Sequence, residues 1–422
     1  MSPSASPPPR TVPGSAYRQL TLVGTAVLVL STTAFFRVPL LPEIGRDLAM
    51  SARELGLVTS TFAIGRLLTD LPVGRLLERI RSSGLLATSA TLMVIGNVAI
   101  SAAWRPLIIY IAAFLLGIAS AVTNATGMHA FSVSAPRRRR GTSLAVFSTA
   151  LLAGQGMGPL VGGTIAAATS WRTAHGAAAG ACALLLTVVA WSHLRGRGVT
   201  TADAEAPAED DESPDPADAG GPATGARGVQ RAALMFVAFA MFFAIGAMPQ
   251  TLVPLIGADL SLPVGWIGAA LGVGGGCRLI GGFVGGVLAD RVSRRAALLP
   301  GLVLQAAGVA LVAGSGIAWW LAGLVVMSLA SWSVAVGATV LADLAPEGHL
   351  GPQLGGFRFV GDIGLILGPL VATQLYDLSS RAAAVAAVAG VLVVAAVWCA
   401  FSVPETGDGR AARRPRGTAP DR

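Results

Sequence analysis

The sequence contains twelve apolar stretches that are each long enough to cross a lipid bilayer as a helix. A helix rises 1.5 Å per residue, so about 20 residues cover roughly 30 Å of hydrocarbon. The chain has 422 residues, of which 53% are hydrophobic and 12% charged, and this is too little polar surface for a soluble protein of that length. We therefore predict an all-α membrane protein with twelve transmembrane helices near residues 20–42, 53–76, 84–103, 106–130, 142–168, 172–194, 230–256, 264–289, 296–315, 318–342, 351–375 and 380–402.

The two halves of the chain repeat one another. Arg66-Leu67 recurs as Arg278-Leu279, and at the same offset the segment 41–48 recurs as 253–260. Repeats of this size, each with several hydrophobic helices, are typical of transporters built from two homologous bundles. We predict two six-helix bundles. The expected domains are a disordered tail over 1–19, a bundle over 20–194, an acidic flexible linker over 195–229, a second bundle over 230–402 and a basic tail over 403–422.

Arginine is distributed unevenly between the two predicted faces of the membrane. Most arginines, among them Arg79, Arg291 and the run 137–140, fall in loops on one face, and few, such as Arg46 and Arg105, fall on the other. Positive loops favour the cytoplasmic side. We therefore expect a multi-pass protein of the cell membrane with both termini and the linker in the cytosol. These loops also account for the net charge of +8, so we expect no nucleic-acid partner.

Charged residues follow helices 2 and 8 in a repeated loop motif. The second copy contains Gly286, Asp290, Arg291 and Arg294, and the first copy contains Gly74, Glu78 and Arg79. The glycine permits close helix approach, while an acid and arginines at a helix end can form ion pairs that lock one conformation. The alternative interpretation is that the arginines only anchor the cytoplasmic end of the helix.

Small residues and a proline recur in helices 5 and 11. Such residues allow close helix packing, and the proline frees a backbone carbonyl and permits bending. Helix packing alone is the simpler interpretation. The motif comprises Gly154, Gly158, Pro159, Gly162 and Gly163 in the first copy, and Gly364, Gly368 and Pro369 in the second.

These motifs and the six-plus-six duplication resemble the major facilitator superfamily, and within it the drug and metabolite:proton antiporters with twelve transmembrane helices. The family's loop signature, roughly G-x-L-a-D-R-x-G-R-R, is matched except that Ser293 replaces the second glycine. The helix 5 motif is similar to the antiporter signature, with Ala145 where a glycine is expected. In helix 4 the family usually has an arginine implicated in proton coupling, where this chain has Ala113. The resemblance thus implies that any proton coupling uses other residues.

Four charges fall inside helices 2 and 11. A charge near the middle of a bilayer costs at least about 2.5 to 3.5 kcal/mol, so it needs a partner, a wet cavity or a function. Arg66 and Asp70 stand four residues apart, as do Arg358 and Asp362. In the family these helices face each other across the two bundles, which would set Arg66 against Asp362 and Asp70 against Arg358. We predict an inter-bundle cluster that is biased by protonation of an aspartate; in the alternative, each pair satisfies itself within its own helix.

Two further arginines have no acidic partner in their own helices. Arg37 lies in helix 1 and Arg278 in helix 8, where Gly282 occupies the position equivalent to Asp70. We expect both to border a central cavity and to favour an anionic substrate, although carboxylates on other helices could pair with them instead. Trp332 and Asn124 are further cavity candidates, because helices 10 and 4 line the cavity in the family. Packing is an equal alternative for both.

The leading hypothesis is proton-coupled efflux of a small organic compound by alternating access between the two bundles. Proton-coupled uptake of an organic anion is an alternative, and a non-transporting membrane receptor or a membrane enzyme is a third. The sequence shows no cluster of catalytic or metal-ligating residues and no phosphate-binding loop, so we expect no enzyme activity, metal or cofactor. The expected partners are the substrate, protons and the lipid bilayer, and we expect a monomer.

The linker residue Ser213 tests the predicted topology. The duplication and the arginine asymmetry independently place it in the cytosol. A cysteine at this position, in a chain whose other cysteines are replaced, should react with a membrane-impermeant thiol reagent only from the cytosolic side. Labelling from outside intact cells alone would show that the topology is inverted.

Overall fold

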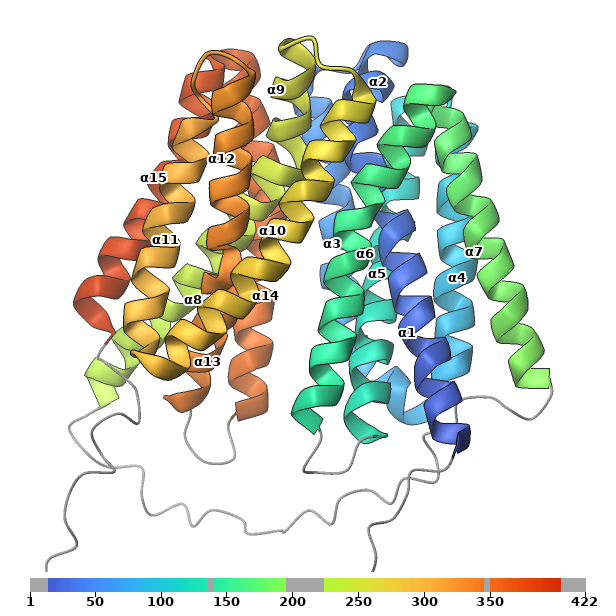
Figure 1. The fold of residues 1–422 in the computed structure, drawn as a ribbon, viewed down its shortest axis with the longest axis horizontal. Helices are drawn as coiled ribbons and strands as arrows, with labels where there is room; N and C mark the ends of the chain where they lie inside the picture. Colours follow the sequence, from blue (N-terminus) through green and yellow to red (C-terminus); the bar gives the residue numbers. More distant parts are fainter. Residues whose placement is uncertain (1–13, 135–139, 195–223, 345–349, 404–422) are drawn as a thin grey trace, which may run out of the picture.

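A computed structural model describes residues 14–134, 140–194, 224–344 and 350–403, and all regular structure within these ranges is helical (Figure 1). Ten of the described helical segments are long and apolar enough to cross a membrane. The other two predicted spans are the helices α3 and α11, which are less apolar because they contain charged residues. The predicted all-α fold with twelve spans is therefore confirmed.

The helices form two groups that lie side by side in Figure 1. The first group consists of α1 (Gly14–Ala34), α2 (Arg37–Asp47), α3 (Ala52–Arg79), α4 (Ser82–Ser101), α5 (Pro106–Val133), α6 (Arg140–Ala168) and α7 (Trp171–Leu194). We call it the N-terminal bundle.

The second group, the C-terminal bundle, contains the same number of spans in more pieces. It consists of α8 (Thr224–Ala247), the π-helix η3 (Met248–Leu252), α9 (Val253–Asp259), α10 (Val264–Arg291), α11 (Arg294–Leu311), α12 (Ile317–Leu329), the 3-10 turn η4 (Ala330–Trp332), α13 (Ser333–Asp343), α14 (Leu350–Leu378) and α15 (Arg381–Ser402). We call the end of the molecule with α2 and α9 the upper end, as in Figure 1.

Three predicted spans are interrupted. The first breaks between α1 and α2, the seventh contains η3, and the tenth contains η4. The π-helix begins next to Pro249, which lacks a backbone donor and so disturbs the regular ladder. At these breaks the chain leaves the regular α-helical register.

The domain boundaries differ from the predicted ones. Helix α1 begins at Gly14, inside the predicted tail, and α8 begins at Thr224, inside the predicted linker. Good helix formers such as Ala16, Arg18 and Gln19 extend the helix beyond its apolar part, so the composition change does not mark the helix start. The remaining tail and linker segments, 1–13, 195–223 and 404–422, lie outside the described residues.

Local signals explain where α3 begins. The Ser51 side chain accepts from the backbone N–H of Glu54, and the Glu54 carboxylate accepts from the N–H of Ser51. This capping box satisfies donors that a helix end leaves unpaired. The N–H of Arg53, a further unpaired donor of this helix end, donates to the Asp377 carboxylate of α14 at 2.8 Å. The upper end of α3 is thus capped by a residue of the other bundle.

Glycines join the two bundles directly along α6 and α10. A Cβ added to Gly275 would lie 2.4 Å from the Cα of Gly156, and one added to Gly163 would lie 2.9 Å from the Cα of Gly268. Only residues without side chains permit backbones to approach this closely. The contact runs from about mid-depth to the upper end, because α6 ascends and α10 descends between these positions.

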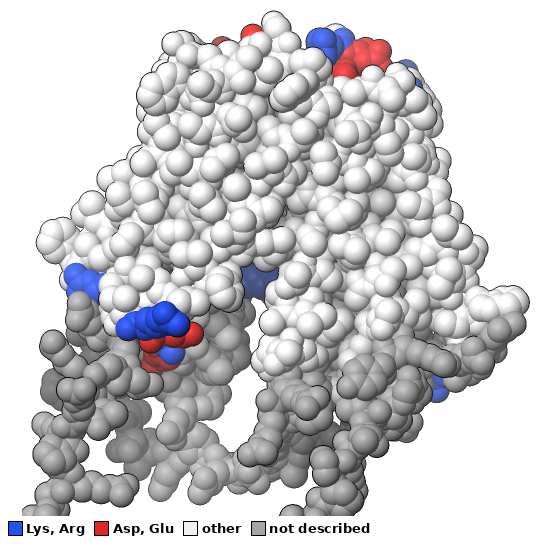
Figure 2. Space-filling view, in the orientation of Figure 1, with Lys and Arg blue, Asp and Glu red and all other residues white. Residues whose placement is uncertain are grey.

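The second junction, between α3 and α14, is also closed in the upper half. Ser60 Oγ donates to the carbonyl of Ile366 at 2.7 Å, and a Cβ on Gly56 would lie 3.0 Å from the carbonyl of Pro369. Toward the lower end the bundles part, and Figure 2 shows a hollow between them. The structure is therefore closed at the upper end and open at the lower end.

The glycine junction predicts different effects at two neighbouring positions of α10. Gly275→Ala should push α6 from α10 and destabilise the closed upper end, because overpacking a tight contact costs roughly 1 to 3 kcal/mol. Gly276→Ala is the matched control, since a Cβ there has nothing within 4 Å. We expect the melting temperature in detergent to fall by several degrees only for Gly275→Ala. Equal melting temperatures would contradict the proposed role of the junction.

Candidate functional site

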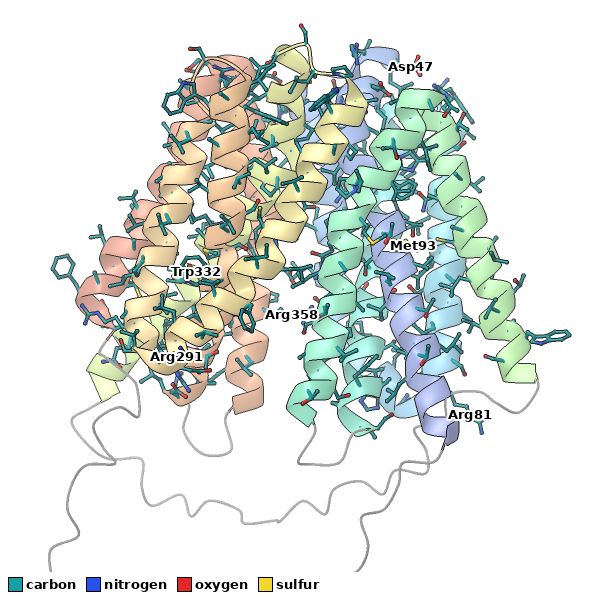
Figure 3. The ribbon with its side chains drawn as sticks, viewed as in Figure 1. Asp47, Arg81, Met93, Arg291, Trp332 and Arg358 are labelled. Carbon is teal, nitrogen blue, oxygen red and sulfur yellow. The ribbon has the colours of Figure 1, made fainter. Side chains whose placement is uncertain are left out.

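Four charged side chains from α3 and α14 gather between the bundles. The Nε of Arg358 lies 3.7 Å from an Oδ of Asp70, so this ion pair joins the two bundles. Arg66 Nη1 donates to Ser120 Oγ of α5 at 3.3 Å, and its charge also acts on Asp362. Figure 3 shows Arg358 at the gap between the two groups of helices. The within-helix interpretation is therefore incomplete, since the Asp70–Arg358 pair connects different helices.

Asp362 is the most enclosed member of the cluster. It is 1% exposed, and neither carboxylate oxygen has a hydrogen-bond donor among the described residues. Its charged neighbours are Arg66, Asp70 and Arg358. Asp70 is thus a second carboxylate close to Asp362, and two neighbouring carboxylates repel each other when both are ionised. The arrangement is suited to holding a proton between two aspartates.

Arg278 lies at the other junction between the bundles. Its Nη1 donates to Gln155 Oε1 of α6 at 3.4 Å, and its Nε has no partner. Among the described residues no carboxylate forms an ion pair with it. The side chain also lines a small cavity inside the C-terminal bundle. Arg278 thus borders a cavity inside one bundle, whereas the prediction placed it beside a central cavity.

Arg37 lies away from the open hollow, whereas we expected it to border a central cavity. It is 1% exposed and lies at the break between α1 and α2, in the closed upper part. Its Nη2 donates to Gln250 Oε1 of η3 at 3.1 Å, and its guanidinium lies 4.2 Å from the ring centre of Phe62. A side-chain carbonyl and an aromatic face thus meet the charge in place of a carboxylate.

Trp332 packs inside the C-terminal bundle. Its Nε1 donates to the carbonyl of Ala297 in α11 at 2.9 Å, and its ring lies so close to Gly285 that a Cβ there would come within 2.3 Å. These contacts with α10 and α11 favour packing over the predicted role as a cavity wall (Figure 3). Asn124 of α5 is buried.

The loop motif has no ion pair across the bundles in the described residues. Arg294 pairs with Asp343, which ends α13 of the same bundle, and also donates to the carbonyl of Thr339. Asp290 and Arg291 are exposed at the end of α10. Figure 3 places Arg291 at the lower end, where the bundles are apart. In the first copy, Gly74, Glu78 and Arg79 lie in the last turns of α3, and Arg79 is exposed.

The Gly-Pro motif uses two faces of α6. Gly154, Gly158 and Gly162 face the backbone of α1 and the turn after it, while the Pro159 carbonyl and Gly163 face Gly268 of α10. In the second copy, Gly364 and Gly368 face the carbonyls of Phe239 and Phe243 in α8, and Pro369 packs against Gly246. The motif therefore sets helix spacing within each bundle and, through α6, between the bundles.

Two polar residues at these sites were missed from the sequence. Gln250 follows Pro249, which is the repeat position of Arg37. Near the pseudo-twofold axis that relates the two repeats, a residue of one repeat can contact residues at the equivalent place in the other. Gln305 interrupts an otherwise apolar run of α11 and is 4% exposed, with its Oε1 unpaired. A single amide in an apolar helix was the available signal in both cases.

A sequence profile described as Major Facilitator Superfamily matches residues 22–276 and 232–421. The chain belongs to the Major Facilitator Superfamily. The two ranges overlap over residues 232–276 and together cover nearly the whole chain. The first includes most of the N-terminal bundle and the second most of the C-terminal bundle. Membership supports secondary transport through a multi-pass membrane protein, and it points to a transporter in place of an enzyme.

The fold is similar to two solved transporters of this kind. One is a bacterial homologue of the human lysosomal transporter Spinster, in an inward-facing and occupied conformation, with a TM-score of 0.69, 14% identity and coverage of 93% of this chain and 96% of the other. The other is a mutant of the nucleoside transporter NupG, with a TM-score of 0.70, 14% identity and coverage of 90% and 99%. At this identity the likeness shows the shared fold alone.

The Asp70–Arg358 pair predicts the outcome of a charge exchange. Asp70→Arg places a third cation beside Arg66 and Arg358, so we expect transport to fall by at least about tenfold. Adding Arg358→Asp restores opposite charges across the bundles and should recover part of the activity. Uptake or efflux of a transported compound, normalised to the amount of protein in the membrane, measures both. A double variant as inactive as the single one would contradict direct coupling of these two residues.

Proposed function

We propose that the protein is a proton-linked exporter of a small organic compound that works by alternating access. The observation that carries this proposal is the cluster of Arg66, Asp70, Arg358 and Asp362 between α3 and α14. Because its members come from both bundles, any rocking of one bundle against the other changes the distances between them. The cluster therefore links the charge state of the carboxylates to the conformation.

The charges of the cluster favour a single exchangeable proton. With both carboxylates ionised, two arginines and two aspartates sum to zero charge. A proton on Asp362 leaves a net positive charge that a dry environment disfavours, unless the bundles move or an anion approaches. Asp362 is the preferred carrier because its ionised form has no hydrogen-bond donor among the described residues. This route requires no arginine at the position of Ala113, which is fully buried.

Two features support export. Under the arginine-based orientation the lower end is cytoplasmic, so the conformation with the open lower end would admit a compound from the cytosol. The motif from Gly154 to Gly163 resembles that of antiporters, which supports export in exchange for protons. We further propose that both termini lie in the cytosol and that the protein acts in the cell membrane.

Uptake of an organic anion is a second candidate function. Arg278 favours it, because a half-buried guanidinium without an acidic partner suits an anionic group. Proteoliposomes with a defined orientation distinguish the two directions. Export predicts that a compound on the cytoplasmic side moves out as protons move in, whereas coupled uptake predicts that both move in the same direction.

The conformation itself reports proton coupling without a known substrate. Spin labels at Thr142 of α6 and Val292 beside α10 lie at the lower ends of the two bundles, in a chain whose three cysteines are replaced. We expect their distance distribution to shift between pH 5 and pH 9, roughly the range over which perturbed buried carboxylates titrate. Asp362→Asn should abolish at least about half of that shift, because the amide cannot exchange the proton.

Asp47→Asn is the matched control, because this carboxylate pairs with Arg172 inside the N-terminal bundle and away from the cluster. It should leave the pH-dependent shift unchanged. A shift that persists in Asp362→Asn, or that disappears equally in both variants, would remove the cluster as the site of proton coupling.

A further inference from the structure

A small cavity inside the C-terminal bundle has the properties of a substrate subsite. It is enclosed by α8, η3, α10, α11 and α12 with the turn η4. Its polar lining comes from Arg278, Gln305, Ser328 and Ser331, and Ile245 and Met327 contribute to the apolar remainder. We propose that this subsite selects organic acids that carry a hydroxyl group close to the carboxylate.

Arg278 provides the contact for the carboxylate. Its guanidinium lines the cavity and also reaches α6, where Nη1 donates to Gln155 at a long 3.4 Å. Its Nε has no partner, and no ion pair to it occurs among the described residues. A guanidinium offers two parallel donors that match a carboxylate, and these bonds are stronger than the one to a neutral amide. An anion at the mouth of the cavity would therefore replace Gln155 as the principal acceptor.

Gln305 provides the contact for the hydroxyl. It is 96% buried, since only 4% of its surface is exposed, and its Oε1 has no donor. An unsatisfied buried polar atom costs roughly 1 to 3 kcal/mol, so this amide is incomplete without a ligand or water. A hydroxyl both donates and accepts. It can therefore satisfy the Gln305 carboxamide in either orientation of its oxygen and nitrogen.

The size of the cavity sets the order of the two groups. The space inside has room for about one water molecule, which is also the size of one hydroxyl group. The hydroxyl thus enters the cavity, the carboxylate stays at its mouth on Arg278, and the hydrocarbon part extends toward the space between the bundles. Because this site belongs to the transport path proposed above, it names the class of compound for either direction of transport.

Three small compounds of similar shape test this assignment on the full-length protein in detergent. The compounds are 2-hydroxyisovalerate, isovalerate without the hydroxyl, and 3-methyl-2-butanol without the carboxylate. Ligand-detected saturation-transfer NMR gives their dissociation constants. We expect the hydroxy acid to bind at least about tenfold more tightly than the plain acid, and the alcohol to bind more weakly than both.

Variants assign this preference to the two side chains. Gln305→Leu keeps the volume and removes the amide, so it should remove the preference for the hydroxy acid while the plain acid still binds. Arg278→Gln should weaken both acids. Gln353→Leu is the matched control, because Gln353 of α14 is also buried with an unpaired Oε1 but does not line this cavity. It should keep the wild-type preference.

The subsite is wrong if the wild type binds the two acids equally or binds neither. It is also wrong if Gln305→Leu keeps the preference for the hydroxy acid, and that result would mean that the cavity holds only a water. These outcomes are independent of the proton-linked mechanism. If the pH-dependent distance between Thr142 and Val292 persists without any preference among the acids, the subsite is wrong and the proposed function stands. If the hydroxy acid is preferred but the distance between Thr142 and Val292 does not change with pH, the subsite is supported and the proposed proton coupling is wrong.

Discussion

The close approach of two backbones at the α6–α10 junction is the constraint on which the rest of the structure depends. Gly156 and Gly275 meet without intervening side chains, and Gly163 and Gly268 repeat the contact nearer the upper end. Such contacts leave no room for water between α6 and α10. The charged groups of the other junction lie below its own closed part, and the distance between Asp70 and Arg358 depends on the position of the bundles because the pair joins them.

The two junctions are related by the internal repeat but are built from different chemistry. Arg66 and Arg278 occupy equivalent positions of α3 and α10. In the first junction Asp70 accompanies the arginine and pairs with Arg358, whereas Gly282 takes the equivalent place in the second, so that Arg278 is left with the neutral Gln155. One junction thus balances its charges internally, while the other keeps an unbalanced cation beside a cavity. In the proposed function this asymmetry separates the proton-linked junction from the substrate-binding one.

The surroundings of a buried polar group cannot be predicted from the sequence of its own helix alone. Arg37 and Arg278 had the same signature in the sequence, a cation inside an apolar helix without a nearby acid. The structure separates them, since Arg37 is enclosed by Gln250 and Phe62 and Arg278 lines a cavity. Their difference arises from residues on other helices, among them η3, whose π-helical turn positions Gln250. Trp332 differs for the same reason, because Gly285 and Ala297 accommodate its ring within the bundle.

The sequence by itself determined the number of spans, their duplication and the helices that contain charges, because hydrocarbon thickness and helix rise translate directly into the length of an apolar run. Together with the family resemblance, it also indicated that Asp70 lies opposite Arg358. Only the tertiary structure decided which end is closed, where the helices break and which buried groups lack a partner. Those features depend on distances between helices that are far apart in the sequence, and glycine contacts such as that of Gly156 with Gly275 set these distances.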